Sequence, residues 1–218
     1  MQPTRRRPPA NAGVVAASRP VRLRVWGQVR RPARLQPTVL VKAMRVTGLQ
    51  AVLEADRPAA IAFVGVGANL GDARRSVVEA LAALGRLPGC TLRRASALYR
   101  SAPVDAAGPD FFNAVAELHT LLSPPELLQA LQAIEQAFGR ERPYFHAPRT
   151  LDLDLLLHGD AVLDTPVLTV PHPRLQLRAF VLRPLLDLAP DLAAPGLGPL
   201  ADWLPGTDPQ ILEKLPSP

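Results

Sequence analysis

The chain has 218 residues, of which 48% are hydrophobic, so its length allows one domain of ordinary size with a proper core. No apolar run approaches the length of a membrane span, and the single Cys90 excludes an internal disulfide and a cysteine-rich zinc site. We therefore expect a cytoplasmic protein that does not associate with membranes.

The net charge of +6 is distributed unevenly along the chain. Residues 1–58 contain 12 Lys or Arg and 2 Asp or Glu, a net charge of +10, whereas residues 59–218 contain 13 and 17, a net charge of −4. Like charge combined with many prolines is typical of disorder. We interpret 1–58 as a disordered extension or as the result of a start codon assigned too far upstream, with an organelle transit peptide as the alternative. The predicted domain spans 59–218.

The first half of this domain alternates between strand and helix patterns. A run with β-branched residues predicts a strand over Ala59–Val66, and a glycine-containing turn follows it. Asp72 fits a helix cap, and apolar residues at helical spacing extend this helix to about Leu87. Residues 91–100 alternate only weakly, and Phe111–Leu118 has the pattern of another strand.

The second half begins with a helix whose start is well marked. Ser123 with Glu126 three positions later forms a capping box, and the helix is predicted to end at Gly139. After a loop and a further strand, Arg174–Leu188 is predicted to form one continuous helix. The chain beyond residue 190 is rich in Pro and Gly, apart from a short element around Trp203. Together these elements predict a two-layer α+β sandwich with partly antiparallel strands.

Two carboxylates occur in a run that alternates between polar and apolar residues from Thr150 to Leu155. On a strand, Asp152 and Asp154 would share one face and the intervening leucines the other. Neighbouring carboxylates repel each other unless they are protonated, paired with cations or bound to a metal. Hard oxygen ligands suit Mg²⁺, so the pair is a candidate magnesium site.

Three arginines precede this strand within ten residues, namely Arg140, Arg142 and Arg149. Guanidinium groups bind phosphate oxygens, so arginines next to a carboxylate pair suit a polyphosphate whose charge Mg²⁺ shares. His172 between two prolines, six residues before Arg178, is a further candidate phosphate contact.

The glycines after the first strand do not match a nucleotide-binding motif. In Gly65-x-Gly67-x-x-Leu70-Gly71 the third glycine falls one residue late for a dinucleotide fingerprint, and the chain has no P-loop. We interpret these glycines as a tight turn from strand to helix, next to which the Asn69 amide is available to a ligand.

The motifs together resemble the 6-hydroxymethyl-7,8-dihydropterin pyrophosphokinase family of folate biosynthesis. The resemblance runs from about Ile61 to Ala189 and rests on these segments: Gly67-Ala-Asn-Leu-Gly-Asp72, Tyr99-Arg-Ser-Ala-Pro103, Phe112-Asn113, Glu135, Gly139-Arg140, Ala147-Pro-Arg-Thr-Leu-Asp-Leu-Asp154, Val170-Pro-His172 and Arg178-Ala-Phe180. It implies a ferredoxin-like fold, with helices packed on an antiparallel sheet. It also implies transfer of pyrophosphate from ATP to the pterin, giving AMP and the pterin pyrophosphate.

The resemblance also implies roles for individual residues. Asp152 and Asp154 would hold two Mg²⁺ ions and, with Arg140 and Arg149, form the catalytic set. The implied ATP contacts are Arg140, Arg142, Arg149, His172 and Arg178, and the nucleotide pocket would be lined by Gln132, Glu135, Leu155 and Thr169. The implied pterin contacts are Ser101, Ala102, Val104, Phe111, Asn113 and Phe180, with the two phenylalanines sandwiching the ring.

The chain departs from the family pattern at four positions and in one loop. His146-Ala147 replaces a frequent Trp-Gly, Pro173 replaces a frequent Tyr, and Val167 stands where some members have Arg. The arginine loop is one residue shorter than in some relatives, which affects the residue that corresponds to Arg142. These departures concern ATP affinity and loop motion rather than the reaction.

Two rival functions remain open at this point. The Asp pair would also serve a metal-dependent phosphoester hydrolase, which needs water and no pterin. Alternatively, the domain is a degenerate enzyme whose basic arm, 1–58, binds nucleic acid, although that arm lacks the folded context such a surface needs. We expect a monomer that binds ATP and the pterin, with no nucleic-acid partner.

Overall fold

The computed structural model describes residues 58–103, 108–139 and 150–216, and its central element is a six-stranded sheet. The strands lie in the order β10-β3-β4-β1-β5, and β2 also pairs with β4, next to β3. Every pairing in this sheet is antiparallel. Their bounds are β1 Ala60–Ala68, β2 Cys90–Ala95, β3 Tyr99–Ser101, β4 Phe111–Thr120, β5 Asp152–His158 and β10 Leu212–Lys214.

Two helices complete the ferredoxin-like arrangement. Helix α2 (Ala73–Leu84) connects β1 to the β2–β3 edge, and α3 (Pro124–Ala137) connects β4 to β5. Strand β1 therefore lies between β4 and β5, as in a βαββαβ fold with an antiparallel sheet. The predicted α+β class and the ferredoxin-like topology are confirmed.

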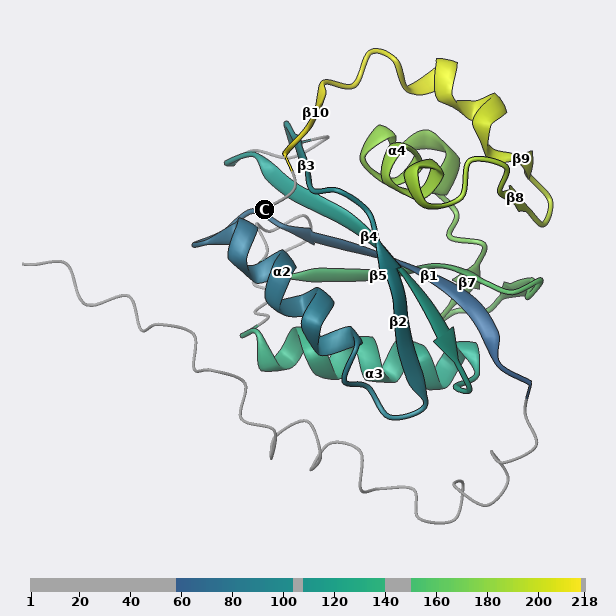
Figure 1. The fold of residues 1–218 in the computed structure, drawn as a ribbon. Helices are drawn as coiled ribbons and strands as arrows, with labels where there is room; N and C mark the ends of the chain where they lie inside the picture. The colour runs from purple at the N-terminus through teal and green to yellow at the C-terminus, as the bar shows by residue number, and fades with distance from the viewer. Residues whose placement is uncertain (1–57, 104–107, 140–149, 217–218) are drawn as a thin grey trace, which may run out of the picture. The chain divides into compact units, whose positions relative to one another are not determined.

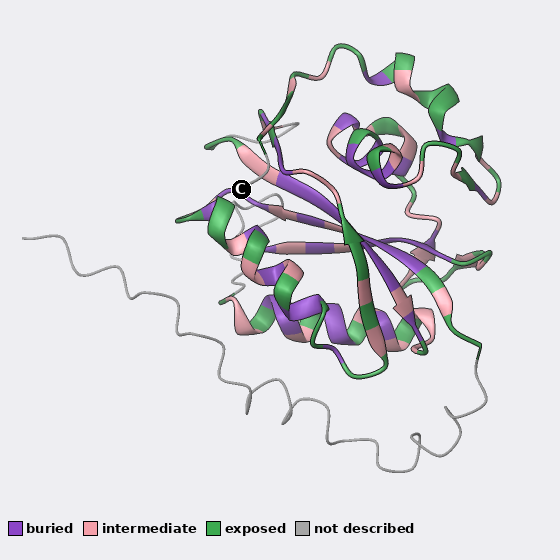
Figure 2. Ribbon diagram, viewed as in Figure 1, coloured by how far each residue is buried: buried purple, intermediate pink, exposed green. Residues whose placement is uncertain are grey.

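One face of the sheet is covered by α2 and α3 (Figure 1). Alternate residues of β1, including Val64 and Val66, point to this side and join the inner faces of both helices in one apolar cluster. Figure 2 shows the buried residues of α3 along the side of the helix that meets the sheet. Leu84 and Leu131 are both fully buried here, so this face is a closed core.

The opposite face of the sheet carries the C-terminal part of the chain (Figure 1). It comprises the short helix η2 (Leu175–Leu177), helix α4 (Ala179–Leu188) and the helix η3 (Leu200–Thr207). Their leucines form a second apolar cluster with Phe63 and Val115 of the sheet. This cluster covers one part of the face, and the polar residues described below lie on the same face.

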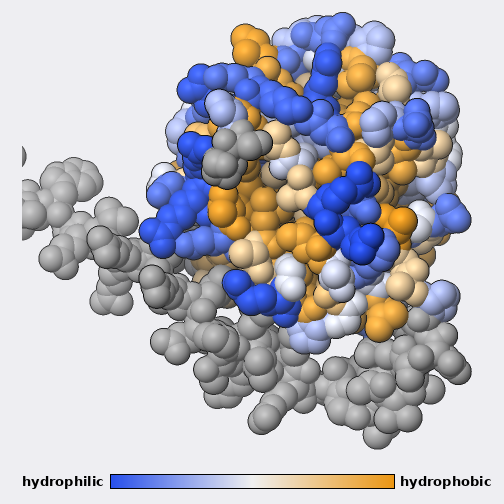
Figure 3. Space-filling view, viewed as in Figure 1, coloured by the Kyte–Doolittle hydropathy of each residue, from blue (hydrophilic) through white to orange (hydrophobic). Residues whose placement is uncertain are grey.

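Small two-stranded sheets complete the described structure. Strands β6 (Leu163–Asp164) and β7 (Thr169–Val170) form one, and β8 (Ala193–Ala194) and β9 (Gly198–Pro199) form the other. On the face shown in Figure 3, hydrophilic clusters separate the hydrophobic residues from one another. Within the described ranges, every helix is too short or too polar to cross a bilayer.

The starts of α2 and α3 were predicted correctly, whereas the extent of the last predicted helix was not. The Asp72 carboxylate accepts the Arg75 amide at 3.2 Å, and Glu126 accepts the Ser123 amide at 2.7 Å, as the caps predicted. The continuous helix over Arg174–Leu188 is wrong, because the backbone of Arg178 is extended (φ −121°, ψ 111°) and separates η2 from α4. Similarly, 91–100 forms two strands rather than one weak element. Residues 1–57 of the predicted extension lie outside the described ranges.

Candidate active site

The two carboxylates of β5 lie side by side on the sheet face that α4 partly covers. Asp152 and Asp154 are partly exposed, whereas Leu151, Leu153 and Leu155 are buried on the opposite side against α2 and α3. The alternation predicted from the sequence is therefore confirmed. Because β5 is the last strand of the sheet, the pair lies at its edge, next to β1.

Two glycines form the floor beside the carboxylates. Gly67 pairs with Asp152 and Gly65 with Asp154 across β1 and β5, so the two rows of residues share a face. The predicted turn from strand to helix contains Gly71 (φ 61°) but neither Gly65 nor Gly67, since both of these lie inside β1. A Cβ on Gly67 would lie 3.2 Å from Oδ1 of Asn113, which is tighter than an ordinary contact. Glycine at this position keeps the floor open between the carboxylates and β4.

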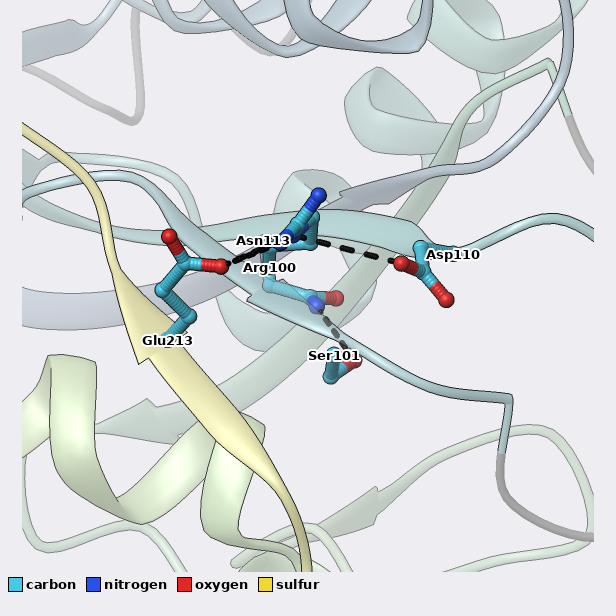
Figure 4. Close-up of polar contacts among 5 residues, drawn as sticks. All are labelled: Arg100, Ser101, Asp110, Asn113 and Glu213. Carbon is cyan, nitrogen blue, oxygen red and sulfur yellow. Dashed lines mark hydrogen bonds and ion pairs between the residues drawn. The ribbon is translucent and has the colours of Figure 1, made fainter.

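Beyond the glycines, β4 and β3 supply a polar pair. Asn113 pairs with Gly67 on one side and Tyr99 on the other, and its Nδ2 donates to the Ser101 hydroxyl at 3.0 Å (Figure 4). Both side chains are buried, so the amide orientation is fixed by this hydrogen bond. Phe111, at the start of β4, pairs with Ser101 and is half-buried. Three predicted pterin contacts therefore lie together.

The edge of this region is held by ion pairs from a neighbouring strand. Arg100, on the other side of β3, donates from Nε to Glu213 of β10 at 2.9 Å and lies 3.9 Å from Asp110 (Figure 4). Tyr99 donates its hydroxyl to Asp187 of α4 at 2.6 Å, and Lys214 of β10 lies 2.7 Å from the same oxygen. Burial, followed by the hydrogen bond to Asp187, raises the pKa of the Tyr99 phenol. These contacts tie β3, β10 and α4 together.

The residue before α4 reaches toward the carboxylates. Nη1 of Arg178 lies 3.7 Å from Oδ2 of Asp154, and its guanidinium lies 5.5 Å from the centroid of the Phe180 ring. Both side chains are partly buried. A cation at this distance from a ring is attracted to its face, so Phe180 helps to orient Arg178. This places the predicted phosphate and pterin contacts of α4 next to the Asp pair.

His172 lies on a segment that is bonded to β5. Its amide donates to the Leu156 carbonyl at 2.9 Å, and its Nδ1 accepts the Arg174 amide at 3.2 Å. Burial, with a smaller contribution from the Arg178 guanidinium, lowers the pKa of His172 from 6.5 to about 4, against the opposing effect of Asp152. The imidazole is therefore neutral at pH 7 and would act as a hydrogen-bonding group rather than a cation.

Other predicted site residues have contacts that favour structural roles. Glu135 is buried at the end of α3, and its Oε1 accepts the Leu153 amide at 2.8 Å. The Leu155 side chain lies in the core on the far side of β5. Asn69 is buried and donates to the Pro109 carbonyl at 3.3 Å, which fastens the loop after β1. His158, which was expected to have no ligand role, bonds the Leu122 carbonyl at 2.9 Å.

The remaining predicted contacts are exposed or lie outside the described ranges. Gln132 is exposed on α3, Ala102 is exposed just after β3, and Thr169 is half-buried on β7. Arg140, Arg142, Arg149 and Val104 fall in residues that the structure does not describe. The roles of all these residues in binding stay predictions.

Comparison with known proteins identifies the family. A family model described as 7,8-dihydro-6-hydroxymethylpterin-pyrophosphokinase (HPPK) matches residues 63–190. A 2-amino-4-hydroxy-6-hydroxymethyldihydropteridine pyrophosphokinase of Pseudomonas aeruginosa is 48% identical over 155 residues, which cover 71% of this chain and 96% of that protein. The chain belongs to the HPPK family. The enzyme of the same name from Synechocystis is 47% identical over 137 residues, covering 63% of this chain and 70% of that protein.

Solved structures agree on the fold of this HPPK family member. A structure titled as HPPK-DHPS in complex with substrates has a TM-score of 0.54 at 13% identity and covers 67% of this chain. The Plasmodium falciparum HPPK-DHPS wild type with SDX-DHP has a TM-score of 0.56 at 14% identity and covers 68% of this chain. The chain spans 43% and 44% of those proteins, so these likenesses support the HPPK fold and nothing further.

The donor set of this HPPK chain suits Mg²⁺ bound together with a phosphate ligand. Among the described residues, no group of three or more His, Cys, Asp or Glu is arranged to hold a metal. Asp152 and Asp154 supply two hard carboxylates on one open face. Mg²⁺ is commonly bound by one or two carboxylates, with waters and substrate phosphates as its other ligands. The residues present therefore fit a metal that arrives with a nucleotide.

Sequence reasoning missed two contributors to this site. The role of Gly65 and Gly67 had a signal, since glycines two apart lie on one face of a strand just as the two aspartates do. The C-terminal segment had no comparable signal, because its contacts with β3 and α4 join residues 113 and 25 positions apart. Only the folded chain brings it to the site.

Proposed function

We propose that this protein transfers the pyrophosphoryl group of ATP to 6-hydroxymethyl-7,8-dihydropterin, in the folate pathway. The hydroxymethyl oxygen attacks the β-phosphorus, the bond from that phosphorus to the oxygen bridging to the α-phosphorus breaks, and AMP leaves. The domain 59–218 would carry this activity. The observation that supports the proposal best is that Asp152, Asp154, Asn113 and Arg178 converge on one face of the sheet.

The carboxylate pair would bind the nucleotide through two Mg²⁺ ions. When bound, these ions would offset the negative charge of the phosphates as the β-phosphorus is attacked. Asp152 and Asp154 contribute the fixed part of that site, because the strand pairing of β5 with β1 sets their spacing and direction. Asp154 is also the candidate acceptor of the hydroxyl proton of the pterin, since a carboxylate within reach of the reacting oxygen can act as a general base.

Arginines would hold the phosphates in line. Arg178 lies within 3.7 Å of Asp154, so a phosphate bound to the metal at Asp154 would be in reach of its guanidinium. Arg140, Arg142 and Arg149 would complete this shell. Neutral His172 would contribute a hydrogen bond to a phosphate oxygen without adding charge.

The pterin would occupy the floor made by Gly65 and Gly67. Its edge carries both hydrogen-bond donors and acceptors, and the Asn113 amide supplies both kinds of group in a fixed orientation. Phe111 and Phe180 are half-buried on elements at this site and would stack against the ring. Ser101 would fix Asn113, and the backbone near Ala102 and Val104 would contact the ring edge.

One assay tests this function against its rivals. Purified full-length protein with ATP and Mg²⁺ should form AMP only when the pterin is added, in equal amount to the pterin pyrophosphate. A phosphoester hydrolase would instead release phosphate without pterin. A degenerate enzyme would form no AMP in either reaction, and its basic arm would bind nucleic acid with an affinity that falls steeply with salt.

A further inference from the structure

One side chain of the C-terminal segment is bonded to the backbone on both sides of Arg178. Oε1 of Gln210 accepts the Ala179 amide at 2.9 Å, and its Nε2 donates to the Leu177 carbonyl at 2.7 Å. The two groups of one amide therefore hold the peptide units before and after Arg178. Gln210 lies outside the span, 63–190, that the family model matches.

Helix α4 lacks a cap of its own at this point. Arg178 is its N-cap residue, and an arginine side chain has no acceptor to offer the first amides of a helix. The extended backbone of Arg178 also interrupts the chain between η2 and α4. Gln210 satisfies the Ala179 amide from a segment 31 residues further along the chain. The start of α4 is thus capped by the fold rather than by local sequence.

Gln210 is itself held in place at several points. Its backbone amide donates to the carbonyl of the buried Thr207 at 2.9 Å. Shortly after it, β10 pairs with β3. Because the backbone is anchored on both sides of Gln210, the side-chain amide presents its oxygen and nitrogen at fixed positions. It can therefore fix the conformation of the backbone to which it bonds.

We propose that Gln210 is a positioning residue that fixes the direction of the Arg178 side chain for nucleotide binding. The inference rests on the proposed function, in which Arg178 contacts ATP. Because Gln210 bonds to the peptide units on both sides of Arg178, the Arg178 backbone has one conformation. Its guanidinium then points toward Asp154 and lies over the Phe180 ring. Without Gln210 the Arg178 carbonyl would still accept the Val181 and Leu182 amides, but the peptide between Leu177 and Arg178 would lose its hydrogen bond to Gln210, and the guanidinium would sample other directions.

The test measures binding of α,β-methylene-ATP with Mg²⁺ to the full-length protein, because this analogue cannot undergo the reaction. Q210M keeps the length of the side chain and removes both hydrogen bonds. It should raise the dissociation constant roughly fivefold, since each lost hydrogen bond is modest in its net effect. D208N is the matched control, because it weakens another contact of the same segment with α4 and should leave nucleotide binding within twofold.

A double variant separates positioning from general destabilisation. In an R178A background, Q210M should weaken nucleotide binding no further, because the residue through which Gln210 acts is gone. If Q210M binds like D208N, or if its effect is undiminished in R178A, the inference is overturned. Melting temperatures are recorded for each variant, and if Q210M does not fold, Q210E takes its place, since it retains the acceptor for Ala179. Wild-type protein that forms no AMP would refute the proposed function instead.

Discussion

Next to the carboxylates, the two faces of β1 and β5 carry opposite kinds of residue, although they are built from the same strands. On one face, β1 and β5 contribute Val64, Val66 and Leu153 to a closed apolar core under α2 and α3. On the other, the residues in between are Gly65, Gly67 and the Asp pair, and they remain accessible. The period of two along each strand thus lets one face provide stability while the other provides the site.

This comparison predicts different consequences for the two faces. Substitution on the face covered by α2 and α3 should change the free energy of unfolding and leave the KM values of the folded protein unchanged. Substitution on the glycine and carboxylate face should do the reverse. Four predictions test this division, and a fifth concerns the contribution of His172 to stability.

The largest effect is expected in the closed core. Leu131 of α3 is fully buried, so Leu131→Ala should lower the free energy of unfolding by about 2–5 kcal/mol through lost transfer energy and the cavity that remains. Chemical denaturation measures this loss. At a temperature where the variant is folded, its KM for ATP and for the pterin should match the wild type, and a changed KM would contradict the separation of the faces.

The carboxylates should behave in the opposite way. Asp152→Ala and Asp154→Ala should each lower kcat by at least ~10², about 2.7 kcal/mol, because a ligand to the metal is lost. Folding should not suffer, since neighbouring carboxylates repel each other without the metal. Asp160→Ala, in the exposed turn after β5, is the control. Near-wild-type turnover of either site variant would remove the metal-site assignment.

Pterin binding should be sensitive to substitution of Gly67 and more tolerant of substitution of Gly65. A Cβ on Gly67 would lie 3.2 Å from Asn113, whereas a Cβ on Gly65 would meet Leu156 at an ordinary 3.5 Å. Gly67→Ala should therefore displace the Asn113 amide and raise the KM for the pterin roughly tenfold, since small misplacements of a binding group are costly. Gly65→Ala should raise it less. Equal effects of the two substitutions would show that Asn113 does not set pterin binding.

Phe180 should matter more for the pterin than for ATP. An aromatic stacking partner contributes about 0.5–1.5 kcal/mol beyond its buried area, so Phe180→Ala should weaken pterin binding by up to about tenfold. ATP binding should fall less, through the lost contact with Arg178. Ligand titrations with each substrate, and a melting curve, measure the three effects. Equal losses for both ligands that follow a fall in stability would make Phe180 structural.

His172 should give a smaller, pH-dependent effect on stability. Its pKa is about 4 in the folded protein and 6.5 ordinarily, so the unfolded state binds the proton more readily. The stability from neutral His172 is complete above pH 6.5 and is lost as the pH falls through 4. Relative to His172→Gln, the wild type should lose on the order of 1 kcal/mol between pH 7.5 and 5, after allowance for partial exposure. Parallel denaturation curves at each pH would contradict this.

Local signals in the sequence were sufficient for several elements. The caps at Asp72 and Ser123 depend on residues within one helical turn, and both were found as predicted. The alternation that places Asp152 and Asp154 on one face depends only on the geometry of a strand. The same locality explains the failure at Arg178, because helical spacing of apolar residues continues through a residue whose backbone is extended and whose neighbour Ala179 bonds to the distant Gln210.

The sequence by itself determined strands β1, β4 and β5, helices α2 and α3 with their caps, the shared face of the Asp pair and the family to which the chain belongs. Tertiary structure decided which residues oppose one another: that Gly67 lies between Asp152 and Asn113, and that Gln210 caps α4. The physical reason is how far apart in the sequence the interacting residues lie. Caps and strand alternation arise between residues a few positions apart, whereas strand register and the docking of the C-terminal segment depend on the packing of the whole domain.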